Sequence, residues 1–306
     1  MNSTDIKVPL DVPHHKRDTY IDNYLKATRG SGNLLLFAGD QKVEHLNGDF
    51  YGEGIAEADA TPHHYFQIAQ QAPVGVFAAQ LGLIARHGMD YLDVPYLVKL
   101  NSKTNIVKPD QDDPYSSAWY DMSQVIEFKE STNLQIPAVG YTVYIGSEYE
   151  DKMLREAAQI TYQAHKNGLL SVIWAYPRGA AIDNYTNPHL IASAAGVASA
   201  LGADFVKVNC PIDNGQNPAL LVKEAVLAAG NTKVVCSGGK TKEATMLLKE
   251  IFEQMHIGET SGCALGRNIH QRELRDAVRL INAIHAIVVE GKNLDQAESI
   301  YQNIKQ

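Results

Sequence analysis

A single lysine stands within an otherwise apolar run of the sequence. Lys207 lies in Ala203–Val208 (ADFVKV), near the end of an expected strand. Burial among apolar groups lowers the pKa of a lysine amine, because it disfavours the charged ammonium form. A neutral amine can attack a ketone to give a Schiff base, and the protonated imine then withdraws electrons. The segment therefore predicts lysine-dependent carbonyl chemistry, against the commoner alternative of a lysine that reaches out to solvent.

Aromatic and turn-forming residues end a second apolar segment, Trp174–Gly179 (WAYPRG). Trp174 and Tyr176 are two positions apart, so on a strand they share one face. Tyrosine can move a proton on an adjacent hydroxyl group. Asp40, after an early apolar run, can hold a substrate hydroxyl or pair with an iminium. If these faces point inward, Asp40, Tyr176 and Lys207 meet beside Trp174 and supply the parts of a metal-independent aldolase.

The elements that must position these residues are expected from alternating patterns along the chain. Helical spacing of apolar residues favours helices at 153–168, 188–202 and 218–230. Apolar runs predict eight strands, at residues 33–38, 74–79, 96–101, 138–144, 169–176, 204–209, 233–238 and 262–267. This order predicts an α/β protein built as a single (β/α)₈ barrel. A doubly wound sheet is the second choice, weakened because no G-x-G-x-x-G follows an early strand.

The chain is expected to hold one barrel domain over residues 31–306, preceded by an N-terminal helical extension over residues 1–30. In a (β/α)₈ barrel the chemistry lies at the carboxyl ends of the strands. The long polar stretch Ser102–Tyr120, between the third and fourth strands, is therefore expected to form an excursion at the barrel mouth.

Glycine-containing motifs follow the last two expected strands. Ser237–Gly239 (SGG) comes where the seventh strand ends, and Gly266–Asn268 (GRN) where the eighth ends. Loops after strands seven and eight of such barrels commonly bind phosphate through backbone N–H groups and a helix N-terminus. Arg267 would add charge-assisted hydrogen bonds. Either motif alone is weak, but the pair on consecutive strands predicts a phosphorylated substrate.

Taken together, the sequence resembles the archaeal-type class I fructose-bisphosphate aldolases, relatives of deoxyribose-phosphate aldolase. The matching motifs follow one another through nearly the whole expected barrel. They are GDQKVEH (39–45), LVKLN (97–101), YIGSE (144–148), WAYPRG (174–179), ADFVKV (203–208), SGG (237–239) and GRN (266–268).

The resemblance implies a role for each matching residue. Lys207 would be the Schiff-base lysine, Tyr176 the proton donor or acceptor, and Asp40 a catalytic contact to the substrate. The implied substrate-binding residues are His45, Trp174, Arg178, Ser237, Gly238, Gly239, Gly266 and Arg267, with Arg178 as a second anchor. One position departs from the family pattern: about ten residues after the lysine, Asn217 stands where the family often carries an acid, and Asp213 is a possible substitute.

The implied function is reversible cleavage of fructose 1,6-bisphosphate to dihydroxyacetone phosphate and glyceraldehyde 3-phosphate, a reaction of glycolysis and gluconeogenesis. Relatives with the same lysine and tyrosine form aromatic precursors by a transaldolase-like step, or thiolyse a phosphorylated ketone. A sugar-phosphate-binding barrel without turnover is a further alternative. A zinc-dependent aldolase is disfavoured, because adjacent residues in the pairs His14-His15 and His63-His64 point apart. Neither a metal nor another cofactor is expected.

Composition restricts the partners and the location. The 306-residue chain has a net charge of −8 and a pI of about 5.8, which disfavours nucleic acid as a partner. No apolar run reaches the roughly 18–20 residues of a membrane span, and the polar N-terminus does not resemble a secretory signal. The three widely spaced cysteines fit reduced thiols in a cytoplasm. As in many barrels of this type, a homo-oligomer is expected.

Overall fold

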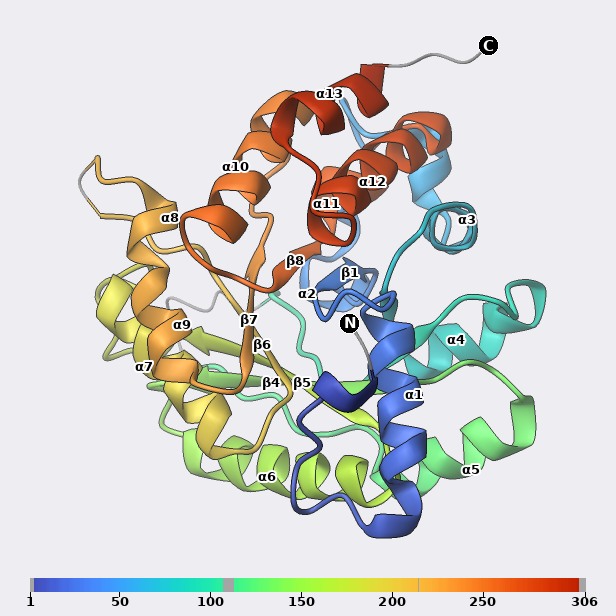
Figure 1. The fold of residues 1–306 in the computed structure, drawn as a ribbon, viewed down its shortest axis with the longest axis vertical. Coiled ribbons are helices and arrows are strands. Elements are labelled where there is room, and N and C mark those ends of the chain that lie inside the picture. Colours follow the sequence, from blue (N-terminus) through green and yellow to red (C-terminus); the bar gives the residue numbers. More distant parts are fainter. Residues whose placement is uncertain (1–2, 107–112, 214, 303–306) are drawn as a thin grey trace.

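Eight parallel strands form one closed barrel in chain order, surrounded by helices (Figure 1). The computed structural model describes residues 3–106, 113–213 and 215–302. The strands are β1 (Leu34–Ala38), β2 (Val76–Gln80), β3 (Tyr96–Lys99), β4 (Ala138–Ile145), β5 (Leu170–Pro177), β6 (Phe205–Val208), β7 (Lys233–Ser237) and β8 (Gly262–Leu265). The predicted (β/α)₈ barrel is confirmed, and the doubly wound sheet is excluded because β1 pairs with β8.

Helices cover the outside of the barrel and connect its strands. They are α1 (Arg17–Ala27), α2 (Gln41–Glu44), α3 (His63–Gln71), α4 (Leu81–His87), α5 (Met122–Thr132), α6 (Glu150–Lys166), α7 (Pro188–Ala200), α8 (Pro218–Leu221), α9 (Lys223–Ala229), α10 (Ala244–His256), α11 (Arg267–His270), α12 (Leu274–Val288) and α13 (Leu294–Gln302). The prediction of a single helix over 218–230 was wrong, because α8 and α9 divide at Val222. The backbone of Val222 stays in the right-handed helical region, so the helical spacing of apolar residues continues across the division.

The barrel interior holds the strand faces that the alternating pattern placed inward. Leu36 and Ala38 of β1, Val172 and Trp174 of β5, and Phe205 of β6 belong to one buried cluster. Side chains alternate along a strand, so the next inward positions beyond this cluster lie at the carboxyl ends of the same strands. The predicted inward faces of these strands are therefore confirmed, and they direct Tyr176 and Lys207 toward the barrel mouth.

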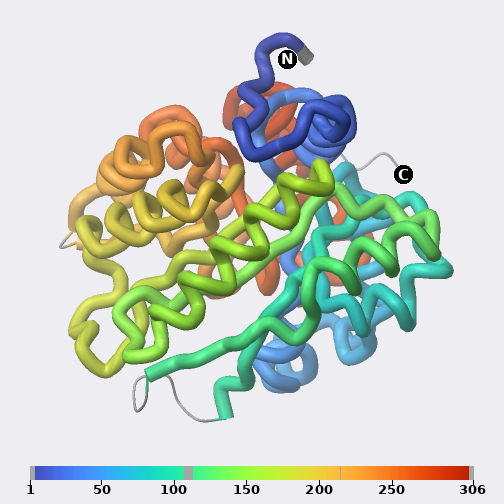
Figure 2. Tube along the Cα trace, turned by 90° about the horizontal axis from the view of Figure 1, so that it is seen from below, coloured from blue at the N-terminus to red at the C-terminus, as the bar shows by residue number. Residues whose placement is uncertain are grey.

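The N-terminal segment closes the opposite end of the barrel. Tyr20 and Tyr24 of α1 join the interior cluster, and the Tyr24 ring stacks on Phe205 at 6.0 Å between centroids. Figure 2 shows this dark blue segment at the other end of the molecule from the teal chain near residue 103. The division at residue 30 stays a prediction, but these residues complete the barrel core. Part of the predicted excursion at the mouth, residues 107–112, lies outside the described residues.

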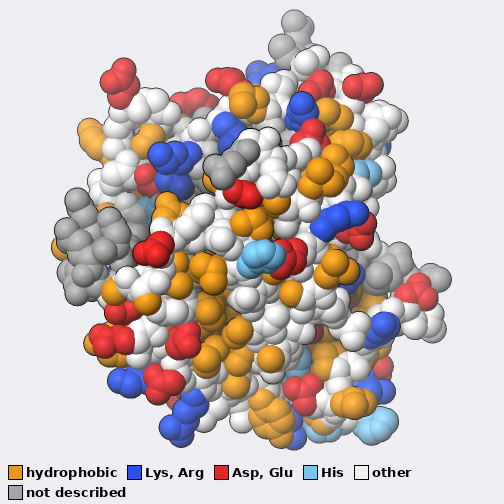
Figure 3. All heavy atoms as spheres, turned by 90° about the vertical axis from the view of Figure 1, so that its left-hand side faces the viewer, with side chains coloured by type: hydrophobic (Ala, Val, Ile, Leu, Met, Phe, Trp, Pro, Cys, Tyr) orange, Lys and Arg blue, Asp and Glu red, His pale blue; other side chains and the backbone are white. Residues whose placement is uncertain are grey.

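The outer surface mixes charged and apolar side chains. Figure 3 shows the face on the left-hand side of Figure 1. Exposed apolar side chains include Leu220 on α8 and Leu227 on α9. Among the described residues, no helix combines the length and apolar character that crossing a membrane requires.

Candidate active site

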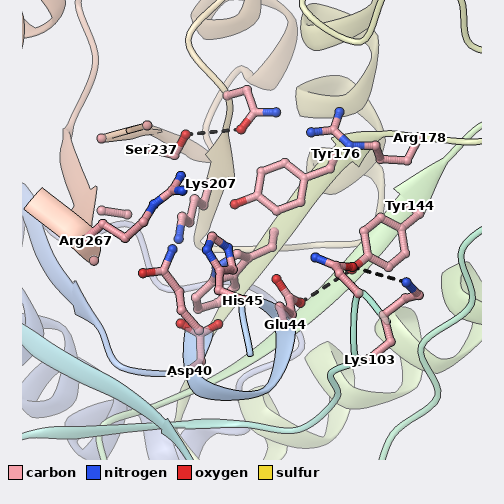
Figure 4. A pocket seen from close by; sticks show the side chains of 18 of the residues that line it. Asp40, Glu44, His45, Lys103, Tyr144, Tyr176, Arg178, Lys207, Ser237 and Arg267 are labelled. Atoms are coloured by element: carbon pink, nitrogen blue, oxygen red, sulfur yellow. Dashed lines mark hydrogen bonds between the residues drawn. The ribbon is translucent and has the colours of Figure 1, made fainter. Parts of the chain in front are cut away.

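One pocket at the carboxyl ends of the strands brings together all the residues that the sequence predicted for the site (Figure 4). They come from the chain after β1, from β5 and the residue after it, from β6, from the end of β7, and from the chain that follows β7 and β8. The predicted residues that line the pocket are Asp40, His45, Trp174, Tyr176, Arg178, Lys207, Ser237, Gly238, Gly239, Gly266 and Arg267.

Lys207 projects from β6 into this pocket and is only 4% exposed. Its amine lies 5.2 Å from the centre of the Trp174 ring. Desolvation lowers the pKa of the Lys207 amine; Asp40 and Glu44 oppose this shift, and Arg267 adds to it. A lowered pKa increases the fraction of neutral amine, which is the nucleophilic form.

A second buried lysine, Lys99 of β3, lies near the same indole. Its amine is also 5.2 Å from the Trp174 ring centre. Unlike Lys207, Lys99 does not line the pocket; its amine donates to the backbone oxygen of Asn101 at 2.6 Å and to Asn101 Oδ1 at 3.1 Å. Burial lowers the pKa of the Lys99 amine as well, but these hydrogen bonds to acceptors favour its charged form and occupy its donors. Of the two lysines, Lys207 is therefore the better nucleophile.

Tyr176, near the end of β5, turns its hydroxyl toward the Lys207 side of the pocket (Figure 4). Desolvation raises the pKa of its phenol well above the ordinary value, and the charges of Glu44 and Asp40 raise it further. Arg178 has a smaller opposing effect. The phenol therefore stays protonated near neutral pH and can donate a proton or a hydrogen bond to a bound substrate.

Several buried polar atoms in the pocket have no hydrogen-bond partner among the described residues. Asp40 Oδ1 is one, in a residue that is 4% exposed, and Gln41 Oε1 and Arg267 Nε are two others. A buried polar group without a partner costs roughly 1–3 kcal/mol. A ligand with hydroxyl and anionic oxygen atoms could satisfy these groups, which fits a sugar phosphate.

The loops after β7 and β8 are held together by Asn268. Its Nδ2 donates to the backbone oxygens of Gly238 at 3.0 Å and Lys240 at 3.1 Å. The N–H of Gly238 donates to the oxygen of Ala264, so this amide is used within the barrel. A Cβ atom on Gly266 would overlap the amide group of Gln41, so a larger residue at this position would require the Gln41 side chain to move.

Arg267 and His45 share a carboxylate that the sequence did not single out. Asp49 Oδ2 lies 3.4 Å from Arg267 Nη1, and the same carboxylate bonds to His45 Nδ1. Gln271 fixes the backbone of Asp49 with a 2.8 Å hydrogen bond to its oxygen. Asp49 therefore orients both a cation and an imidazole that line the pocket.

Other residues of the pocket wall were missed as site residues. They are Gln41, Glu44, Lys103, Asn105, Pro114, Tyr144, Asn209 and Ala264. Gln41 and Glu44 stand within the GDQKVEH motif and Tyr144 begins YIGSE, so the motifs carried a signal for them.

Neither Asn217, at the place where the family often carries an acid, nor Asp213, its possible substitute, lines the pocket. Asn217 caps α8, where its side chain accepts from the N–H of Ala219 at 2.9 Å, and it does not line the pocket. Asp213, the possible substitute, accepts from Gln216 Nε2 at 2.8 Å and is likewise absent from the pocket wall. The carboxylates that line the pocket are Asp40 and Glu44. Within residues 3–106, 113–213 and 215–302, no cluster of three or more His, Cys, Asp or Glu could hold a metal ion.

Similar solved structures carry the same architecture. A fructose-bisphosphate aldolase from Slackia heliotrinireducens superimposes with a TM-score of 0.96 at 52% identity, covering 98% of this chain and 95% of that chain. An archaeal fructose-1,6-bisphosphate aldolase, described with its catalytic lysine covalently bound to the carbinolamine intermediate of the substrate, gives a TM-score of 0.74 at 31% identity. The match covers 88% of this chain and 98% of that one.

Sequence relatives agree with this result. The chain is 54% identical over 301 residues to a Methanocaldococcus jannaschii protein named fructose-bisphosphate aldolase/6-deoxy-5-ketofructose 1-phosphate synthase, covering 98% of this chain and 96% of that protein. It is 34% identical over 276 residues to a class 1 fructose-bisphosphate aldolase of Thermoproteus tenax, covering 89% and 96%. The DeoC/LacD family aldolase domain matches residues 34–272. The resemblance seen in the sequence motifs is confirmed, and the chain belongs to the DeoC/LacD family of aldolases.

Proposed function

We propose that the protein cleaves fructose 1,6-bisphosphate reversibly into dihydroxyacetone phosphate and glyceraldehyde 3-phosphate through an imine on Lys207. The observation that carries this proposal is the buried Lys207 amine, which lines the pocket and whose pKa desolvation lowers. Tyr176 on the neighbouring strand supplies a protonated phenol, and Arg267 supplies a cation for a phosphate.

In the proposed reaction, the neutral Lys207 amine attacks the ketone carbon C2 and gives a carbinolamine. Loss of water leaves a protonated imine, which withdraws electrons from the C3–C4 bond. The bond breaks when the C4 hydroxyl loses its proton, releasing the aldehyde and leaving an enamine on Lys207. Protonation at C3 and hydrolysis then release dihydroxyacetone phosphate. Tyr176 is proposed to move the proton on the substrate hydroxyl.

Borohydride trapping tests this proposal, because borohydride reduces an imine to a stable amine. The mass of the wild-type protein should increase only when fructose 1,6-bisphosphate or dihydroxyacetone phosphate is present, and peptide mapping should locate the adduct on Lys207. Lys207→Met should neither trap nor turn over, whereas Lys166→Met, at an exposed position on α6, should do both. An adduct on Lys99, Lys240 or Lys242, or no adduct at all, would refute the assignment.

A second reaction is favoured by the double name of the Methanocaldococcus jannaschii relative. A 6-deoxy-5-ketohexose 1-phosphate would form here if the enamine of dihydroxyacetone phosphate added to a three-carbon aldehyde ending in a methyl ketone. Such an acceptor carries no phosphate, so it would use the same Lys207 imine without a second anion site. Turnover assays on a panel of phosphorylated ketoses and of aldehydes, run with excess chelator, separate the two reactions and test independence from metal.

Three further expectations stay predictions. They are the assembly into a homo-oligomer, the cytoplasmic location, and the place in glycolysis or gluconeogenesis.

A further inference from the structure

Glu44 lies in the wall of the pocket and has no role in the reaction proposed above. It is the last residue of α2, the one-turn helix that follows Asp40 at the end of β1. Its Oε1 accepts a long hydrogen bond of 3.4 Å from the Tyr144 hydroxyl of β4. Figure 4 shows its carboxylate turned into the cavity, with the Lys207 side of the pocket to one side and Tyr144 to the other.

The surroundings of Glu44 favour a carboxyl group that can gain and lose a proton. Burial raises the pKa of Glu44, and the charge of Asp40 adds to the increase, whereas Lys99, His45 and Lys207 oppose it. Glu44 interacts electrostatically with charged or titratable groups of the elements around it. These groups are Asp40, His45, Lys99, Lys103, Tyr144, Tyr176, Arg178 and Lys207.

Formation and hydrolysis of the imine require a group that can donate a proton and take it back. The hydroxyl of the carbinolamine leaves as water only after it receives a proton, and hydrolysis of the product imine requires the proton to be removed again. Tyr176 can donate, but its raised pKa makes the phenolate base scarce near neutral pH. Asn217, at the position of the family acid, caps α8 outside the pocket. Both carboxylates in the wall, Asp40 and Glu44, act on the charges of the two buried lysines, but Glu44 is the one that also accepts a hydrogen bond from Tyr144.

We propose that Glu44 is a catalytic residue, the general acid that dehydrates the carbinolamine on Lys207 and the general base for the reverse hydration. In the forward step, the protonated carboxyl gives its proton to the carbinolamine hydroxyl. The carbon–oxygen bond breaks, water leaves, and the nitrogen lone pair completes the carbon–nitrogen double bond. The products are the iminium on Lys207, one water molecule and the Glu44 carboxylate. This inference rests on the proposed imine chemistry.

The rate of imine formation tests the proposal directly. Enzyme is mixed with dihydroxyacetone phosphate and quenched with borohydride at increasing times, and the adduct is counted by intact-protein mass. Glu44→Gln keeps the shape of the side chain but removes the transferable proton, so imine formation should slow by roughly 10²- to 10⁴-fold. The equilibrium affinity for dihydroxyacetone phosphate should change little. Glu127→Gln, at an exposed position on α5, should form the imine at the wild-type rate.

A second variant separates proton transfer from a structural role. Glu44→Ala leaves space for a small carboxylic acid, so added formate should restore part of the rate in proportion to its concentration, while Tyr176→Phe should show no such rescue. Imine formation at the wild-type rate in Glu44→Gln, or a slow Glu44→Ala that formate leaves unchanged, would overturn the role of Glu44. A wild-type protein that never traps on Lys207 would instead refute the proposed function.

Discussion

The indole of Trp174 occupies the space that a side chain at Gly140 would need. Gly140 lies on β4, next to the strand that carries Trp174, and a Cβ atom built on it would overlap the ring carbon Cζ3. The same atom would come within 2.7 Å of Leu97 Cδ2 on β3. The absent side chain lets the ring lie across β4, where its centre is 5.2 Å from the amine of Lys207 and 5.2 Å from that of Lys99.

Gly140→Ala should therefore displace the indole and destabilise the barrel. Forcing one extra carbon into a packed core costs typically 1–3 kcal/mol. Urea unfolding should report this loss, and borohydride trapping on Lys207 should slow because the indole that packs beside the Lys207 amine is displaced. Gly196→Ala on α7 is the matched control, because its Cβ would meet only Ala228 of α9 at ordinary contact distances and should raise stability by about 0.5–1 kcal/mol. Equal stabilities for the two variants would contradict this account of Gly140.

The convergence of Asp40, Tyr176 and Lys207 could be predicted because it depends on two regular features. Side chains alternate along a strand, and the parallel strands of a barrel end at one mouth. Local alternation therefore sufficed to assign each inward face. The packing of Trp174 against Gly140 could not be predicted, because it depends on how far an indole reaches across a neighbouring strand.

Tyr176→Phe should preserve the fold and substrate binding but reduce turnover by roughly 10²- to 10⁴-fold, the usual contribution of a general acid–base group. The reason is that phenylalanine fills the same space without the protonated hydroxyl that faces the pocket. Steady-state kinetics on fructose 1,6-bisphosphate check this, with Tyr162→Phe on the outer face of α6 as the control. Wild-type turnover in Tyr176→Phe would remove Tyr176 from the proposed mechanism.

Arg267→Ala should weaken the binding of phosphorylated substrates by about 10- to 100-fold, because a hydrogen bond to a charged group is worth roughly 1.5–3 kcal/mol. Removing Arg267 also leaves the negative charge of Asp49 without the guanidinium that neutralises it, and this charge would repel the bound phosphate. Affinities for dihydroxyacetone phosphate and for unphosphorylated dihydroxyacetone should be compared in the variant, and in Arg155→Ala on the exposed side of α6. Equal losses for both ligands would show that Arg267 does not bind the phosphate.

Loop-borne residues of the site were harder to predict than strand-borne ones. Glu44 lies in a four-residue helix and Asp49 in a three-residue 3₁₀ helix (Asn47–Asp49), so no periodic pattern assigns a direction to either side chain. Asn217 stands about as far after Lys207 as the acid that the family often carries, but its position before Pro218 makes it the cap of α8. Sequence spacing locates a residue on a strand better than in a loop.

A buried ion-pair network joins the N-terminal segment to the barrel. His165 of α6 bonds to Asp11 through Nδ1 at 2.9 Å and to Asp204 through Nε2 at 3.1 Å. Asp204 also accepts from the Tyr20 hydroxyl and from the N–H of Ser171. Burial alone would lower the pKa of His165, but the hydrogen bonds and charges of Asp204 and Asp11 outweigh it and raise the pKa to about 9 from the ordinary 6.5.

Stability should consequently fall as the pH rises from about 6.5 to about 9. Folded His165 holds its proton more tightly than unfolded His165, so its contribution is complete below pH 6.5 and is lost as the pH rises through the folded pKa. The shift corresponds to at most about 3 kcal/mol. The free energy of urea unfolding, measured across this range, should decline in the wild type but much less in His165→Gln, which cannot be charged. His256→Gln, at an exposed position on α10, should keep the wild-type slope. A His165→Gln profile parallel to that of the wild type would assign the pH dependence to other groups and leave His165 neutral in the folded protein.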